Sequence, residues 1–136
     1  MKRHQLVLLA VASAAIFPAA CGSSSSSSTP AYCADRSSLE SSVKGLTTAD
    51  IRSNGVSALT AQAQKVQADA QALVSSAKGD FPQQTAAINT SVNSLSTALK
   101  GLPSSPSVPQ LATVATDASS VATAIKGFSD ATSSKC

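Results

Sequence analysis

FPQQTAAINTSVNSLSTALKGL, residues 81–102, is the stretch that decides the fold. Its core-type residues recur at alternating intervals of four and three positions, so each one returns to the same side of a helix. This spacing predicts a helix with one stripe buried against neighbouring helices. The stripe consists of Phe81, Thr85, Ile88, Val92, Leu95, Leu99 and Leu102.

Three other segments repeat this spacing, and together they predict an all-α fold. Four such helices with brief connections in one short chain favour an up-down-up-down four-helix bundle. The alternative is a disordered Ala-, Ser- and Thr-rich stalk, but such a stalk has no reason to keep an apolar period. The further stripes are Leu39, Val43 and Leu46; Val56, Leu59, Ala63, Val66, Ala70, Leu73 and Ala77; and Leu111, Val114, Ala118, Val121, Ile125 and Phe128.

Recurring Lys-Gly pairs predict where the helices end, because Lys suits the negative end of the helix dipole and Gly often follows a helix. At the last pair the apolar phase continues, which extends the fourth helix toward Ala131. Helix starts are predicted at residues 80–83 and 107–110, where a capping residue precedes Pro and Gln. The second helix is predicted to start at residues 53–55, Ser-Asn-Gly. The pairs are Lys44-Gly45, Lys78-Gly79, Lys100-Gly101 and Lys126-Gly127.

The first helix is predicted to be short, at about 12 residues against about 24 for the second. We therefore expect residues 47–54 to run along the bundle as an extended segment, with Ile51 turned inward. Eight stretched residues span up to ~28 Å, which covers the difference in helix length. This arrangement brings Cys33 and Cys136 to the same end of the bundle.

The N-terminus has the layout of a secretory signal peptide, predicted over residues 1–20. Lys2, Arg3 and His4 precede an apolar run from Leu6 to Phe17, and Pro-Ala-Ala follows it at 18–20. A transmembrane anchor is the alternative, but the run is shorter than the roughly 20 apolar residues that a bilayer requires. The chain is therefore expected to be exported.

Pro18-Ala19-Ala20-Cys21 resembles the bacterial lipobox, in which a small residue precedes a cysteine that is acylated and becomes the mature N-terminus. Pro18 stands where that motif usually has Leu, Val or Ile. Residues 21–31 then form a Ser-rich stretch typical of a flexible tether. Cys21 is therefore predicted to attach lipid and hold the domain at the outer face of a membrane; cleavage that leaves a soluble secreted protein is the alternative.

Cys33 and Cys136 lie near the two ends of the domain predicted for residues 32–136. Outside the cytoplasm the simplest expectation is one disulfide, closing a loop of about 100 residues. Two thiols without a nearby His make a poor metal site, and redox pairs more often lie close in sequence. We predict a structural disulfide.

No known catalytic, nucleotide-binding or metal-binding motif is present, and without residues 1–20 the chain has no histidine. The predicted signal peptide, residues 1–20, holds two of the 10 basic residues and none of the 7 acidic ones. The rest of the chain therefore has a net charge of +1 and no basic cluster that would bind nucleic acid. We predict no catalytic residues, cofactor or metal, although folding could assemble a carboxylate pair. The carboxylates are Asp35, Glu40, Asp50, Asp69, Asp80, Asp117 and Asp130.

Taken together, the chain resembles small actinobacterial lipoproteins and secreted proteins with a lipobox, a Ser-rich tether and a helical domain bounded by cysteines. The matching parts are residues 18–21, the serine run, Cys33, residues 50–59 and Cys136. The resemblance implies an envelope location and a helical bundle, and it brings no catalytic residues.

Three functions follow as hypotheses. The first is a non-catalytic envelope module that binds a protein or a cell-wall component, with an amide-rich surface on the second helix as one possible contact. The second is a carrier that holds a small apolar ligand between its helices, although inward alanines imply little room. The third is an enzyme of unfamiliar type. The amide-rich surface consists of Gln62, Gln64, Gln67 and Gln71.

Overall fold

The computed structural model describes residues 29–48 and 51–136, with the backbone alone for 51–53. It contains four helices: α1 (Ala31–Thr48), α2 (Ile51–Ala77), α3 (Pro82–Lys100) and α4 (Val108–Thr132). No strand occurs in these two ranges. The predicted leader, the lipid-attachment residue Cys21 and most of the tether lie outside the described residues.

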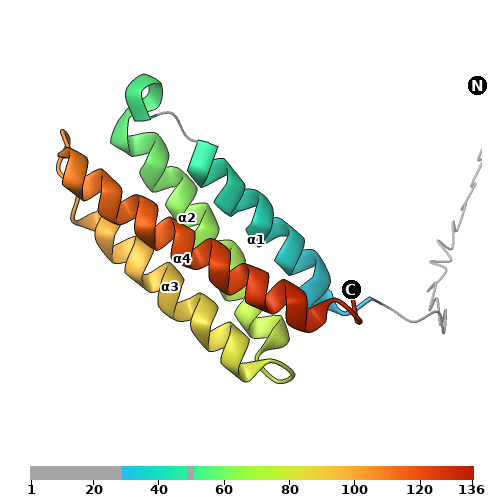
Figure 1. Cartoon of the computed structure of the whole chain (residues 1–136). Coiled ribbons are helices and arrows are strands. Elements are labelled where there is room, and N and C mark those ends of the chain that lie inside the picture. The colour runs from blue at the N-terminus through green and yellow to red at the C-terminus, as the bar shows by residue number, and fades with distance from the viewer. Residues whose placement is uncertain (1–28, 49–50) are drawn as a thin grey trace, which may run out of the picture.

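The four helices lie side by side and alternate in direction along the chain, as Figure 1 shows. Each helix packs against two neighbours, so that α1 contacts α2 and α4, while α3 contacts the same two helices from the other side. This is the up-down-up-down bundle that the apolar period predicts.

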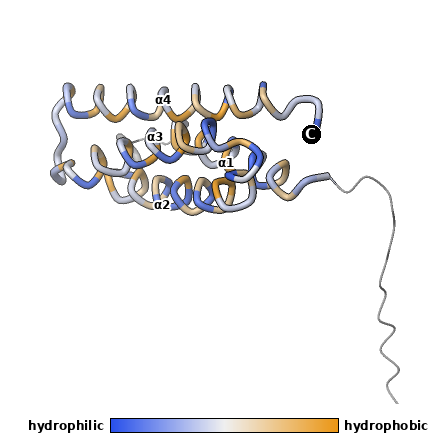
Figure 2. The backbone as a smooth tube through the Cα atoms, turned by 90° about the horizontal axis from the view of Figure 1, so that it is seen from below, coloured by the Kyte–Doolittle hydropathy of each residue, from blue (hydrophilic) through white to orange (hydrophobic). Residues whose placement is uncertain are grey.

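The predicted stripes form the core of the bundle. Every predicted stripe residue is buried or partly buried, and Figure 2 shows apolar positions recurring along the inner sides of the helices. The interior is therefore the shared seam that three- and four-residue spacing requires. The side chains with no exposed surface include Leu39, Val66, Leu73, Ile88, Val121 and Phe128.

The first helix is the shortest of the four, as predicted, but it is longer than expected, and the described residues of 47–54 are helical rather than extended. It continues through Gly45 to Thr48, and α2 already begins at Ile51. Leu46 is only 4% exposed, so its burial favours another helical turn over a stop at Gly45. The predicted extended segment over 47–54 is therefore wrong, and the inward orientation of Ile51 lies outside the described side chains.

Gly45 lies where α1 and α2 approach each other closely. A Cβ at this position would lie 3.3 Å from the Gln62 amide nitrogen, which is tighter than most real contacts. Gly45 therefore lies within α1 beside the Gln62 side chain of α2, and it does not end the helix.

A break near the start of α2 lies at the predicted start signal in residues 53–55. Gly55 has φ 68° and ψ −175°, a backbone conformation that only glycine adopts without strain. The backbone is helical on both sides of it. The signal therefore marks an interruption within α2, whereas the first helical residue is Ile51.

The ends of α2 and α3 agree with the Lys-Gly signals, whereas α4 continues past its Lys-Gly pair. α2 ends at Ala77 and α3 at Lys100, while α4 runs through Gly127 to Thr132, as the phase of Phe128 indicates. Gly101 nevertheless keeps a right-handed conformation with φ −81°, and its N–H donates to the Thr97 carbonyl at 3.1 Å. The helix therefore ends there without a left-handed glycine.

The predicted starts of α3 and α4 are confirmed in position. At α4 the Ser107 backbone N–H donates to Oε1 of Gln110 at 2.8 Å, which is the return contact of a capping box. At α3 the residue before the helix is Phe81 and no side chain caps it, so Asp80 does not have the capping role expected for it.

A disulfide joins Cys33 in α1 to Cys136 after α4, as predicted, with their Cα atoms 5.6 Å apart. Three aromatic rings cluster at the same end of the bundle. Tyr32 meets Phe81 and Phe128 edge to face, with ring centroids 5.5 and 6.0 Å away. Buried aromatic contacts therefore support the end of the bundle that the disulfide closes.

Candidate functional site

The disulfide marks the end of the bundle where the N-terminal segment joins it. Thr29 and Pro30 lead into α1 beside Tyr32, and Ser134 and Lys135 line the same hollow. Figure 1 shows the C-terminus close to this entry point. The α3–α4 connection, residues 101–107, lies at the opposite end of the molecule.

Ser42, Lys65 and Asp69 form a polar cluster between α1 and α2. The Ser42 hydroxyl donates to an Asp69 carboxylate oxygen, and Lys65 Nζ donates to Ser42 Oγ at 2.8 Å and to Asp69 Oδ2 at 3.1 Å. Lys65 and Asp69 stand four residues apart in the sequence, but nothing there distinguishes Ser42, because serines are abundant throughout the chain.

The geometry of this cluster suits a structural contact. A serine beside a lysine is one arrangement that activates a nucleophile. However, Ser42 is only 3% exposed and its hydroxyl is directed at a carboxylate. The cluster instead links the two helices by hydrogen bonds across their interface.

Two more polar contacts hold α1 against its neighbours. Ser76 donates to Asp35 Oδ2 at 2.6 Å across the α1–α2 seam. On the other side of α1, Arg36 Nη1 donates to Thr132 Oγ1 at 3.2 Å. Asp35 and Asp69 therefore accept interhelical hydrogen bonds from serines.

The carboxylates do not assemble a metal centre in the part of the chain that the structure describes. No group of three or more His, Cys, Asp or Glu side chains comes together there. Asp50 lies outside the described residues. Of the predicted site residues, Cys33 and Cys136 are brought together by the fold. Cys21 lies outside the described residues. The sequence predicted no catalytic residues, so there is no predicted catalytic site to look for in the structure.

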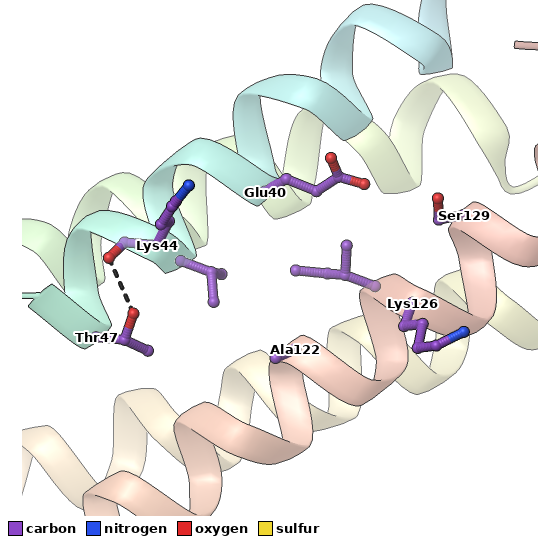
Figure 3. A pocket seen from close by; sticks show the side chains of 8 residues that line it. Glu40, Lys44, Thr47, Ala122, Lys126 and Ser129 are labelled. Atoms are coloured by element: carbon purple, nitrogen blue, oxygen red, sulfur yellow. Dashed lines mark hydrogen bonds between the residues drawn. The ribbon is translucent and has the colours of Figure 1, made fainter.

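A groove between α1 and α4 has a mainly apolar lining and a volume of about 370 Å³. Val43 and Ile125 form its floor, and Figure 3 shows the remaining lining side chains arranged around them. Sequence reasoning missed the groove, because it depends on how two distant helices meet. The other lining residues are Glu40, Lys44 and Thr47 from α1, and Ala122, Lys126 and Ser129 from α4.

Part of the amide-rich surface of α2 lines a second, more polar hollow of about 310 Å³ against α3. Gln64 and Gln67 lie there beside Ser96 and Lys100. Gln71 is exposed elsewhere on the helix, and Gln62 contacts α1 near Gly45. The four glutamines therefore do not form one continuous binding surface.

Comparison with known proteins identifies no relative. No protein family, curated protein or solved structure matches this chain. Among the described helices, none is long and apolar enough to cross a membrane.

Proposed function

We propose that the chain is an exported, lipid-anchored protein of the cell envelope, attached at Cys21 to the outer side of a membrane. The domain acts there as a non-catalytic binding or structural module. The proposal combines the leader-like residues 1–20, the small residues before Cys21 and the Ser-rich stretch after it.

The disulfide is the observation that carries the proposal. The chain has three cysteines, and Cys33 and Cys136 are joined to each other. Cys21 therefore has no cysteine left in its own chain to pair with. An unpaired thiol is a liability outside the cell, whereas acylation removes it. A disulfide between the other two also suits an oxidising compartment.

The fold supports a particular orientation for the anchored domain. The chain enters α1 at the disulfide end, so a tether from Cys21 would place that end toward the membrane. The α3–α4 connection would then face away. It carries the exposed Pro103 and is followed by Val108, which is 80% exposed. This far end is the surface that an envelope partner would meet first.

A carrier that encloses an apolar ligand among its four helices has less support. Leu39, Leu73 and Val121 fill the bundle axis with no exposed surface. The hollows between α1 and α4 and between α2 and α3 both open at the surface. A ligand held within the axis would have to displace these side chains.

Cell fractionation of a Cys21→Ser variant tests the anchor. We expect the unaltered chain in the membrane fraction and the variant in the soluble or secreted fraction, because two or more acyl chains give stable anchoring. Ser23→Ala is the matched control and should remain with the membrane. If the unaltered chain were soluble, or the variant stayed in the membrane, the proposed attachment would be wrong.

Site-specific photocrosslinking on intact cells tests the module role. A crosslinker at Ser105, in the α3–α4 connection, is expected to capture an envelope protein or wall fragment. The same crosslinker at Ser134, near the disulfide, is expected to capture lipid. Absence of any adduct from Ser105 under all growth conditions would count against a binding role.

A further inference from the structure

We infer that the α1–α4 groove binds a single-chain amphiphile with an anionic head group, such as a fatty acid. The inference concerns the folded domain and does not depend on the anchor or the module role.

Among the described residues, the covalent and hydrogen-bonded links between α1 and α4 lie at one end of their seam. There the disulfide and the Arg36–Thr132 hydrogen bond hold the two helices together. Farther along, α4 contributes the short side chains of Ala122 and Ser129 to the groove, and Figure 3 shows Glu40 of α1 on its opposite side. Long and short side chains that do not interdigitate leave a channel between the helix axes.

The lining of the channel suits one alkyl chain. Val43 and Ile125 form the floor, and Ala122 adds a methyl group at the side. The volume of about 370 Å³ lies at the lower end of the range typical of small-molecule sites. The floor residues are only 5% and 4% exposed, so the aliphatic stems of Lys44 and Lys126 must also cover the chain.

The charges at the rim favour an anionic head group. Glu40 lies 3.6 Å from Arg36, and Lys126 Nζ lies 2.7 Å from Asp130 Oδ2, so both have partners of opposite sign. Lys44 forms no ion pair with any carboxylate in the described part of the chain. A carboxylate head group placed beside Lys44 would supply that partner.

Filling the groove provides the first test. The probe is 11-(dansylamino)undecanoic acid, titrated below its micelle concentration into the full chain carrying Cys21→Ser. Ala122→Trp places a large ring in the groove and is expected to weaken probe binding by at least about tenfold. Ala112→Trp changes an exposed residue of the same helix outside the groove, and is expected to bind like the parent.

Removing the rim charge provides the second test. Lys44→Glu is expected to weaken binding of the acid by about tenfold while leaving binding of its methyl ester unchanged. Lys78→Glu, at an exposed site away from the groove, should leave both affinities unchanged. Circular dichroism of each variant checks that the helices are intact. Residues 1–28 are the same in every variant, so any probe that they bind does not contribute to the differences between variants.

Three results would overturn the inference. The first is no probe binding by the parent chain, and the second is equal binding by the two tryptophan variants. The third is dimerisation of the parent that Ala122→Trp abolishes in sedimentation, because a second copy of the chain would then be the occupant.

Discussion

Val121 and Val108 show how one residue type has different roles along the same helix. Val121 has no exposed surface, whereas Val108 at the start of α4 is 80% exposed. Removing two methyl groups from the core loses transfer free energy and leaves a cavity, whereas the same change in solvent loses little.

The two valines therefore make a matched pair for a stability measurement. Val121→Ala is expected to lower the free energy of unfolding by about 2 kcal/mol. Val108→Ala should change it by less than about 0.5 kcal/mol. Urea denaturation followed by circular dichroism measures both. Equal effects from the two variants would show that α4 does not present Val121 to a core.

Ser42 supplies a second comparison at this scale. Its hydroxyl bonds to Asp69 and accepts from Lys65 across the α1–α2 interface. Ser42→Ala should lower the free energy of unfolding by roughly 1 to 3 kcal/mol, because it leaves partly buried polar groups with fewer partners. Ser41→Ala, at an exposed position on the same helix, is the control and should be near neutral in the same denaturation assay.

Glycines at different positions within the helices should respond in opposite ways to substitution. Gly55 has φ 68°, which strains any residue with a Cβ, so Gly55→Ala is expected to destabilise the fold by about 1–3 kcal/mol. Gly127 lies within α4 with open space around it, and Gly127→Ala should stabilise by about 0.5–1 kcal/mol. Thermal melting of both variants tests this, and a rise in Tm for Gly55→Ala would contradict the break in α2.

The elements themselves were largely predictable from the sequence, since apolar spacing reports directly on which side of a helix is buried. The buried stripes of Leu73, Leu95 and Val121 follow from that spacing alone. The end of α1 could not be predicted in the same way. The Lys44-Gly45 signal is local, whereas the burial of Leu46 depends on the neighbouring helices. Local capping signals are weaker than the burial of a large apolar side chain.

The interhelical contacts were less predictable than the helices. Nothing in the sequence pairs Ser42 with Asp69, which are 27 positions apart, or Ser76 with Asp35, which are 41 positions apart. Such pairs depend on how two helices meet, which a local pattern does not report. The α1–α4 groove was missed for the same reason. The disulfide was predictable because cysteine pairing outside the cytoplasm follows from residue count and location along the chain.

At the scale of the whole molecule, the disulfide is the one covalent link between the two ends of the domain. Cys136→Ser is expected to lower Tm clearly under non-reducing conditions, since closing a loop of about 100 residues contributes up to ~4.7 kcal/mol in the chain-entropy model. Under reducing conditions the variant and the parent should melt alike. An unchanged non-reduced Tm would show that the link does not stabilise the bundle.

The central claim is that Cys21 carries lipid while Cys33 and Cys136 pair with each other. Intact-mass and peptide mass spectrometry of the protein from its native cells reads both features together. The account predicts a chain that begins at an acylated Cys21 and contains a Cys33–Cys136 crosslinked peptide. A chain that retains residues 1–20, or a mature chain with an unmodified Cys21, would contradict it.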